Sequence, residues 1–428
     1  MADQKDLSIG THFGEVPKIY ICNREGQRKG GADGELKINP IDGSHVMSCK
    51  FEESIELPCV IGEIIYKDYG KFRAGHIFEN GYDYLDIVFK GNHDPAKDET
   101  EVMFEIINVT SIEAGYLVGS TYDVIRLEVA QYPIYRNYKV WNVSKGYEED
   151  TVIHDIVEDI KDEFLDKHNI RVKEIKLEQT KNKLKSFCIP FWNPLTCMKY
   201  LSYIAMNSNG AGGYFFFNDL RGHFHFQSLE ELMSAGDTHN YEMEAIRVTE
   251  YDQGKNDTQQ LVKDFREDLA NKSYYSIGLA GTTIERFDWF KKKNYTYKLG
   301  YKKRKPKNVN DLYEKDEYVN NFYGFHTNSG FRNNENDIDH MKAITYNQLL
   351  TSLSNQCQSK IVINGKANIK CGDRMNVSVS TKVNENSESI DGEWFIRGIL
   401  HSFNARFGTF KQVLSLSRIG NFDHSISG

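Results

Sequence analysis

IVINGKANIKCGDRMNVSV, which spans residues 361–379, is the stretch in which the β-pattern of the chain is clearest. It holds two short runs of β-branched and apolar residues, with Gly365 and Gly372 between them. Two more such runs follow, EWFIRGIL at residues 393–400 and TFKQVLSL at residues 409–416. Runs of this kind, bounded by Gly, Asn and Asp, are typical of β-strands joined by turns. The sequence therefore predicts a β-structure for the last block of the chain.

The first block of the chain shows the same pattern. Similar runs, rich in β-branched and aromatic residues, occur at residues 18–22, 46–51, 60–66, 84–89, 102–109 and 124–129. Clusters of Gly, Asp and Asn separate these runs. Strands at such spacing predict a sandwich or a barrel.

The residues between these two blocks have a different period. Apolar residues recur at three- and four-residue steps over residues 152–165, which predicts an amphipathic helix. A second helix is expected to begin at Asn193-Pro194, because Asn is a good N-cap and Pro suits the first helical position. Residues 214–217 and 223–226 alternate around a turn and predict a β-hairpin, and residues 241–248 indicate a further strand.

The predicted fold class is α+β and β-dominated, with two antiparallel β-barrel domains around a mixed α/β middle region. Residues 249–346 are polar and without a period, so we expect long insertions or exposed loops there, with a third helix near Ile344. The predicted domains are 1–140, an N-terminal β-barrel; 141–240, helices and a hairpin; 241–353, a strand, polar insertions and a helix that complete the middle and the second barrel; and 354–428, the C-terminal part of the second barrel.

Composition limits the function classes. The chain has 428 residues, of which 39% are hydrophobic and 27% charged, as in ordinary globular proteins. No stretch reaches the roughly 18 consecutive apolar residues of a membrane span, so we expect no membrane insertion. The seven cysteines form no CxxC pair, which favours folding in a reducing cytoplasm. The net charge of −8 argues against nucleic-acid binding over the whole surface.

One segment departs from the acidic whole. Residues 291–307 contain no acidic residue and interleave basic residues with tyrosines, a combination that can bind single-stranded nucleic acid. A solvated loop is the first interpretation, docking to an acidic partner subunit the second and contact with passing DNA the third. The candidate contact residues are Lys291, Lys292, Lys293, Lys302, Lys303, Arg304, Lys305 and Lys307.

The sequence supplies no catalytic, cofactor-binding or metal-binding residue that we would select. His223 and His225 have a chelating spacing, but only His239 is near enough in the sequence to be a third ligand. Acids such as Asp86 and Glu105 occupy strand positions that we expect to face solvent, and no pair stands out for glycan hydrolysis. The chain also lacks a Gly-x-Ser-x-Gly elbow and a His-Glu-x-x-His helix. We therefore expect a protein that is not an enzyme.

Several of these motifs together resemble a known family. The last block runs Gly365-Lys-Ala-Asn-Ile-Lys-Cys-Gly372-Asp, then Asp391-Gly-Glu-Trp-Phe-Ile396 and His401-Ser-Phe403, and closes on a strand that ends at Arg418. This order is similar to the last barrel of tail hub proteins. Phe191-Trp-Asn-Pro-Leu195, followed by the aromatic hairpin, likewise resembles the central hub proteins of myovirus baseplates. The motifs are shared with the spike-hub proteins of type VI secretion and with other contractile injection systems.

The resemblance implies a structural role in a phage tail. It implies that both β-barrels resemble the tail-tube subunit, and that a homotrimer forms a ring joining a three-fold spike to a six-fold tube, with DNA passing through its lumen. Expected partners are a separate spike protein, because the sequence ends at Gly428, together with tube or tube-initiator proteins and baseplate wedge proteins. The expected location is the virion tail baseplate, assembled in the host cytoplasm. A tail-associated glycan or peptidoglycan hydrolase and a receptor- or carbohydrate-binding tail protein remain the alternatives.

Overall fold

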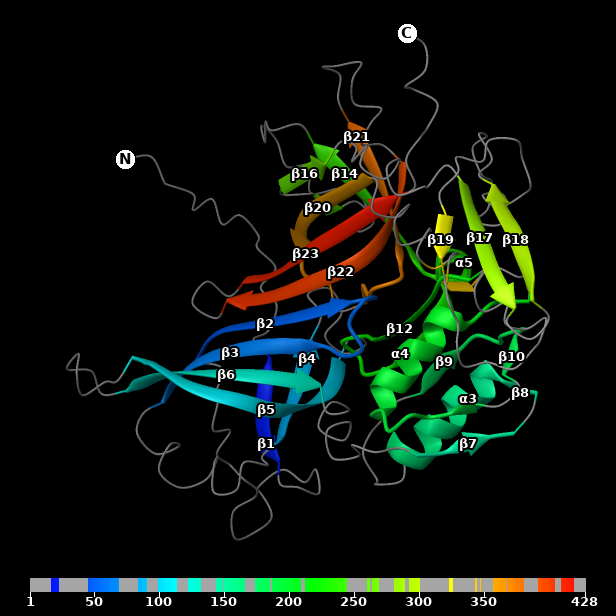
Figure 1. Ribbon diagram of the computed structural model, residues 1–428. Helices are drawn as coiled ribbons and strands as arrows, with labels where there is room; N and C mark the ends of the chain where they lie inside the picture. Colours follow the sequence, from blue (N-terminus) through cyan, green and yellow to red (C-terminus); the bar gives the residue numbers. More distant parts are fainter. Residues whose placement is uncertain are drawn as a thin grey trace, which may run out of the picture.

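The structure is a computed structural model, and its main chain carries the strands, helices and turns discussed below (Figure 1). It describes residues 17–22, 45–68, 84–90, 99–113, 122–131, 144–148, 150–165, 174–184, 187–208, 212–244, 260–261, 264–268, 281–288, 292–300, 323–325, 343–344, 347, 357–366, 368–380, 392–404 and 409–418. The β-dominated α+β class predicted from the sequence is confirmed.

The first six strands form a curled antiparallel sheet, which we call the first half-barrel. These strands are β1 (Lys18–Cys22), β2 (Val46–Ser54), β3 (Ile61–Asp68), β4 (Tyr84–Lys90), β5 (Glu99–Glu113) and β6 (Asp123–Gln131), in the order β1-β4-β5-β6-β3-β2. Alternation along β2 buries Cys49 and Phe51 and exposes Lys50 and Glu52, because successive side chains of a strand point to opposite faces. The buried side chains fill one apolar core.

Seven later strands form the second half-barrel. These are β14 (Thr238–Glu244), β15 (Gln260–Leu261), β16 (Asp264–Asp268), β20 (Cys357–Asn364), β21 (Arg374–Ser380), β22 (Gly392–Asn404) and β23 (Thr409–Arg418). β22 pairs with β2 of the first half-barrel in antiparallel register from Ser48↔Asn404 to Ser54↔Gly398. Both half-barrels therefore belong to one continuous 13-stranded sheet, which crosses the molecule in Figure 1.

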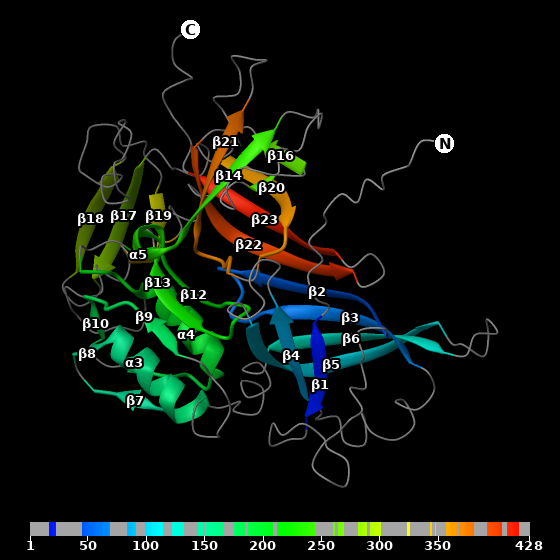
Figure 2. The same ribbon diagram turned by 180° about the vertical axis from the view of Figure 1, so that it is seen from behind.

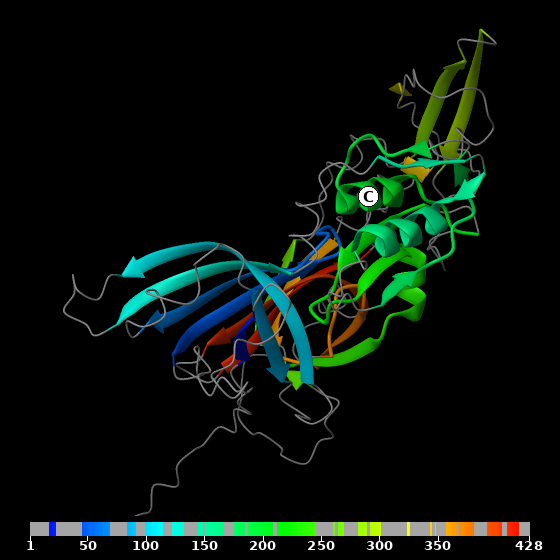
Figure 3. The same ribbon diagram turned by 90° about the horizontal axis from the view of Figure 1, so that it is seen from below.

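A mixed middle part packs beside this sheet. Its helices are α3 (Ile153–Ile160), continued by the π-helical turn η1 (Lys161–Leu165), α4 (Pro194–Ile204) and α5 (Leu229–Ala235). Its strands are β7 (Gly146–Tyr147), β8 (Thr151–Val152), β9 (Ile175–Leu177), β10 (Lys183–Leu184), β11 (Phe187–Cys188), β12 (Tyr214–Asn218) and β13 (Phe224–Ser228). A further small sheet contains β17 (Gly281–Asp288), β18 (Lys293–Gly300) and β19 (Tyr323–Phe325), and it lies beside α5, away from the first half-barrel (Figures 2 and 3).

The helix caps and the hairpin of the middle part form where the sequence indicates them. The Asn193 side chain accepts a hydrogen bond from the Thr196 N–H at 2.9 Å and caps α4, with Pro194 at the first helical position. Ser228 caps α5 in the same way, through the Glu231 N–H at 3.2 Å. The predicted aromatic hairpin is β12–β13, in register from Tyr214↔Ser228 to Asn218↔Phe224.

The two half-barrels repeat one strand order. Around the sheet, β1-β4-β5-β6-β3-β2 corresponds to β14-β21-β22-β23-β20-β16. The matched strands also occur in the same order along the chain, since β1 to β6 match β14, β16, β20, β21, β22 and β23 in turn. A β-bulge occurs at the same place in each: at Ile107 in β5, opposite β6, and at Arg397 in β22, opposite β23. One pair of strands differs in direction between the two half-barrels: β1 is antiparallel to β4, whereas β14 is parallel to β21.

Aligning the two half-barrels on this bulge also superimposes their cores. The matched buried pairs are Ile64 and Ile361, Leu85 and Met375, Ile87 and Val377, Phe104 and Trp394, Leu127 and Leu414, and Val129 and Leu416. Each pair is apolar on both sides, although the identity of the residue is kept in few of them. The repeat is thus one of packing and topology rather than of sequence.

The polar segment that the sequence assigned to loops contains strands. β15 to β19 all lie between residues 260 and 325, so the expectation of exposed loops was wrong for these residues. Ala343, Ile344 and Asn347 are helical, and the rest of the expected third helix lies outside the described residues. The sequence also missed the short helix α5.

Gly365 offers a test of the packing where Phe403 and Phe410 of the second half-barrel enter the core of the first. A Cβ atom at this position would overlap the ring of Phe410. That ring is stacked on Phe403 with centroids 4.0 Å apart and has little room to move. We expect Gly365→Ala to lower the free energy of unfolding by about 1–3 kcal/mol, the usual cost of overpacking, as measured by urea denaturation.

Gly146→Ala is the matched control, since a Cβ atom there has nothing within 4 Å. Equal stability of the two variants would contradict the tight packing at Gly365.

Candidate functional site

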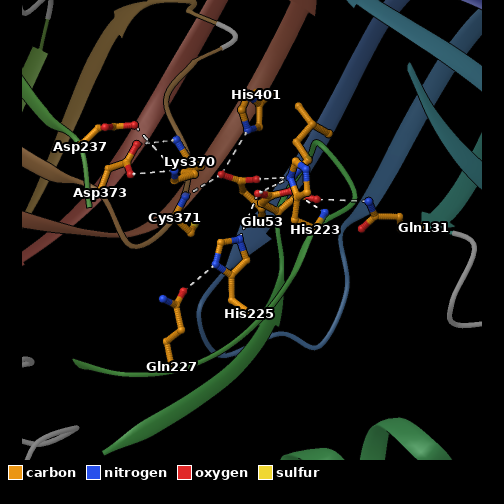
Figure 4. A network of polar contacts seen from close by, with 12 residues as sticks. Glu53, Gln131, His223, His225, Gln227, Asp237, Lys370, Cys371, Asp373 and His401 are labelled. Carbon is orange, nitrogen blue, oxygen red and sulfur yellow. Dashed lines mark hydrogen bonds and ion pairs between the residues drawn. The ribbon is translucent and has the colours of Figure 1, made fainter. Parts of the chain in front are cut away.

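The three parts of the chain meet at a buried polar cluster, which Figure 4 shows from close by. We call it the polar junction. Its members are Glu53, Gln131, Asp219, His223, His225, Cys371 and His401. Glu53 and Gln131 come from the first half-barrel, Asp219 and the two neighbouring histidines from the aromatic hairpin, and Cys371 and His401 from the second half-barrel.

Glu53 lies at the centre of the junction and is 1% exposed. Its Oε2 accepts a hydrogen bond from the Leu220 N–H at 2.6 Å, in the turn of the hairpin. Its Oε1 accepts one from the Cys371 N–H at 2.9 Å and lies 3.8 Å from His401 Nε2. One carboxyl group therefore ties the first half-barrel to both other parts.

Asp219 organises the hairpin side of the junction and is fully buried. Its Oδ2 lies 3.0 Å from His225 Nε2 and 3.3 Å from His223 Nδ1, and its Oδ1 accepts from the His223 N–H at 2.9 Å. Burial alone would raise the pKa of this carboxyl, but the hydrogen bonds from the two histidines outweigh burial and hold the pKa well below its usual value. The His225 ring also stacks on Phe217, with centroids 4.6 Å apart.

Two neighbouring contacts extend the junction. Gln131 donates from Nε2 to the Asp219 carbonyl at 3.1 Å and thus joins β6 to the hairpin. In the second half-barrel, Asp373 lies 3.0 Å from His239 Nε2 through its Oδ2, which also accepts from the Lys370 N–H at 3.2 Å. These contacts fix the two turns that face Glu53.

Glycines allow both turns to reach the junction. Gly222 has a φ of 85° and closes the hairpin turn by donating its N–H to the Asp219 carbonyl at 2.9 Å. Gly372 has a φ of 93°, and a Cβ atom there would come within 2.9 Å of Leu232 Cδ2. Positive φ values of this size favour glycine. The motif Gly-Asp at 372–373 therefore shapes the turn that presents the Cys371 N–H to Glu53.

The thiol and the histidines of this region are held by internal contacts. Burial raises the pKa of the Cys371 thiol well above its usual value, and the nearby Glu53 carboxyl raises it further, so the thiol is a poor nucleophile. His223 and His225 are both held by Asp219, while His239 is held by Asp373. Within the described residues, no group of three His, Cys, Asp or Glu side chains is placed to hold a metal ion.

Of the basic residues proposed from the sequence, the structure describes Lys292 and Lys293. Lys292 is exposed with a φ of 46°, and Lys293 opens β18, which pairs with β17 along its length. Residues 293–300 thus form a strand, which the sequence did not predict, and Asn294 and Thr296 on it are exposed. The remaining candidates, Lys291, Lys302, Lys303, Arg304, Lys305 and Lys307, lie outside the described residues. A contact of this run with DNA or with an acidic subunit stays a prediction.

The polar junction itself was missed by sequence reasoning. In the sequence, Glu53 looks like any other acid in an alternating strand. The one signal was that the alternation of β2 gives this acid an inward-facing position, where an apolar residue is expected. Asp86 and Glu105 were expected to face solvent and are instead buried, at 2% and 7% exposure. Leu220 and Cys371, the partners of Glu53, come from distant parts of the chain, which the sequence pattern does not report.

Comparisons with known proteins agree with this architecture. No protein-family model and no curated protein matches the chain. Among solved structures, a tail protein from Neisseria meningitidis MC58 aligns over 94% of this chain and 96% of its own, with a TM-score of 0.53 and 10% identity. The 43 kDa tail protein of prophage MuSo2 from Shewanella oneidensis aligns over 94% of this chain and 98% of its own, with the same TM-score and identity.

The chain therefore has the fold of phage-type tail proteins. This is the fold that the resemblance to baseplate hub proteins predicts. No helix of the described residues is both long and apolar enough to cross a membrane.

The central role of Glu53 leads to a first test of the junction. In Glu53→Gln one of the two backbone N–H groups would face an amide NH2, a donor, and would lose its acceptor. We expect a loss of about 1–3 kcal/mol in the free energy of unfolding, the cost of an unsatisfied buried donor, measured by chemical denaturation. Glu52→Gln is the control, because Glu52 is exposed on the same strand. A similar effect of both substitutions would contradict the role of Glu53.

The lowered pKa of Asp219 predicts a pH dependence. A carboxyl whose pKa is lower in the folded than in the unfolded chain stabilises the fold above its unfolded pKa of about 4. That contribution is lost as pH falls below this value. We therefore expect Asp219→Asn to be less stable than the unsubstituted protein at pH 7, with a difference that narrows below pH 4 in thermal denaturation. Asp237→Asn, at a carboxyl whose side chain is 71% exposed, is the control. A gap that stays constant with pH would exclude this contribution of Asp219.

Proposed function

We propose that the chain is a structural hub of a phage tail baseplate, in which three copies form a ring between a three-fold spike and a six-fold tail tube. The observation that carries this proposal is the repeated strand order of the two half-barrels within one continuous sheet. Two similar units in each of three chains give six near-equivalent positions on a closed ring. Such a ring matches a six-fold tube on one side and a three-fold partner on the other.

The polar junction supports the same role. A ring of six similar units requires a fixed angle between the two units of each chain. The β2–β22 pairing and the hydrogen bonds of Glu53 set this angle in the folded chain. The proposed domains, with two tube-like barrels around a mixed middle part, follow from this arrangement.

The outer face of the sheet suits a conduit for DNA, the further part of this proposal. Opposite the core, the adjacent strands β6, β3 and β2 carry charges of both signs, and β23, which lies beyond β22, adds a positive charge. The charged residues with outward positions on these strands are Arg126, Glu128, Glu63, Lys67, Lys50, Glu52 and Lys411. Arg126 lies 3.7 Å from Glu63, and Lys50 lies 4.0 Å from the same carboxylate. A wall with four positive and three negative groups has little net charge and would hold passing DNA weakly, because tight binding needs a large excess of basic residues.

We propose that this role is structural and involves no catalysis by the chain. The proposed partners are a spike protein, tube or tube-initiator proteins and wedge proteins, and the proposed location is the virion tail.

The assembly state tests this proposal. We expect light scattering coupled to size exclusion to give three times the mass of one chain, either for the purified protein or after addition of the spike protein encoded with it. A dilution series distinguishes a stable trimer from a concentration-dependent one. A monomer that persists in the presence of the spike protein would contradict the hub function.

A further inference from the structure

Half of strand β5 has an open edge. β4 pairs with β5 from Glu99 to Glu105, whereas β6 pairs with it from Phe104 to Glu113. Beyond Glu105, no strand among the described residues pairs with the side of β5 that faces away from β6. This part of the β5–β6 ribbon extends away from the rest of the sheet in Figures 1 and 3.

The open edge is uncharged and exposes two isoleucines. Residues 106–112, IINVTSI, contain no charged side chain and no proline. Ile107 and Ile112 are 58% and 48% exposed, and each is the extra residue of a β-bulge. Exposed sheet edges in natural proteins usually carry lysine, proline or inward charges that prevent pairing. An edge without these features is competent to pair with another strand.

The second half-barrel shows what covers the equivalent edge. There, β21 pairs with β22 only from Gly392 to Phe395, and the bulge follows at Arg397. From Gly398 to Asn404 the free side of β22 is covered by β2. Aligned on the two bulges, Thr110 of β5 corresponds to Leu400 of β22, and Leu400 lies opposite Glu52.

The counterpart of β2 in the second half-barrel is β16. β2 pairs with β3, and β16 pairs with β20 in the same antiparallel sense. The register matches Glu52 with Asp268 and Lys50 with Arg266, so that both strands have a basic residue followed two positions later by an acidic one. β2 has a second neighbour, β22, whereas no described strand pairs with the other side of β16.

We propose that β5 of one chain pairs in antiparallel fashion with β16 of a second copy, with Thr110 opposite Asp268 and Ser111 opposite Glu267. This contact repeats between chains the β2–β22 contact made within each chain. It rests on the proposed ring and names the strands and the register that close it. The β5 edge of each copy pairs with the β16 edge of the next copy, so the contact is head-to-tail. Such contacts form a closed ring when the rotation from one copy to the next divides evenly into a full turn.

Cysteine pairs test the register directly. In a Cys188→Ser background, which removes the one exposed cysteine among those described, the double variant Thr110→Cys/Asp268→Cys is oxidised and run on a denaturing gel without reductant. Opposite residues of antiparallel strands lie about 4.5–5.5 Å apart, within reach of a disulfide. We expect covalent species of two and three chains, which disappear on reduction.

Two further pairs serve as controls. Glu52→Cys/Leu400→Cys is the equivalent pair within one chain, and it should give a disulfide that leaves the mass of the chain unchanged. Thr110→Cys/Glu63→Cys keeps the edge residue but moves the second cysteine to β3, in the middle of the sheet, and it should give no covalent oligomer.

Charge on the edge provides a test that does not depend on disulfides. Ile107→Lys/Ile112→Lys should raise the concentration needed for assembly by roughly tenfold or more, equivalent to about 1.4 kcal/mol. Both isoleucines are exposed in the single chain, so the variant should fold normally. Ile61→Lys is the control, since Ile61 is also an exposed isoleucine, at 40%, but lies on a strand paired on both sides.

The outcomes separate this proposal from the proposed function. A trimer that forms no cross-link and tolerates both lysines would overturn the β5–β16 contact and leave the ring intact. A cross-linked ladder that continues beyond three chains would support the contact and overturn three-fold closure. A monomer without cross-links would overturn both.

Discussion

The hydrogen bonds of Glu53 are the constraint on which the arrangement of the three parts depends. A buried carboxyl group is costly unless its oxygens are satisfied. Here the two acceptors are satisfied by backbone N–H groups from two different parts of the chain, at Leu220 and Cys371. Neither turn can move away without leaving the carboxyl group buried and partly unpaired. The relative orientation of the half-barrels and the middle part is therefore fixed by the requirements of one side chain.

This constraint makes the contact between the two half-barrels rigid. Pairing of β2 with β22 could on its own tolerate twist and sliding, because a two-strand contact has limited stiffness. The turn that carries Cys371 belongs to the second half-barrel, and its N–H points to a residue of β2. The polar junction thus holds the sheet at the place where the first half-barrel passes into the second. A fixed angle between repeated units is what a closed ring requires.

The sequence predicted the strands and helices well where periodicity reports burial. The strand pattern around Phe51 and Ile64, the amphipathic helix that buries Ile156, and the Asn193 cap all depend on neighbours close in the chain, and they are confirmed. The repeat of the half-barrels was not predictable in this way. Pairs such as Phe104 and Trp394 keep only apolar character and position, while the intervening loops differ, so no sequence period survives. The polar junction was equally hidden, because Glu53 and Cys371 are 318 residues apart.

The bulge residue is charged in β22 and apolar in β5, and this difference follows from the stage at which each edge meets its partner. At Arg397 the bulge lies in a junction made once, during folding of a single chain. Its carbonyl accepts from the Ile55 N–H at 3.0 Å and its guanidinium pairs with Glu56. A charged residue is suitable there because its partner is always present. At Ile107 the equivalent edge meets its partner only when chains associate, and a lone charge would oppose association unless the partner supplied its opposite. An exposed isoleucine instead gains from burial, at roughly 25 cal/mol per Å² of apolar surface removed from water. The cost is that Ile107 and Ile112 are exposed in the free chain, which favours an assembly in which they are covered.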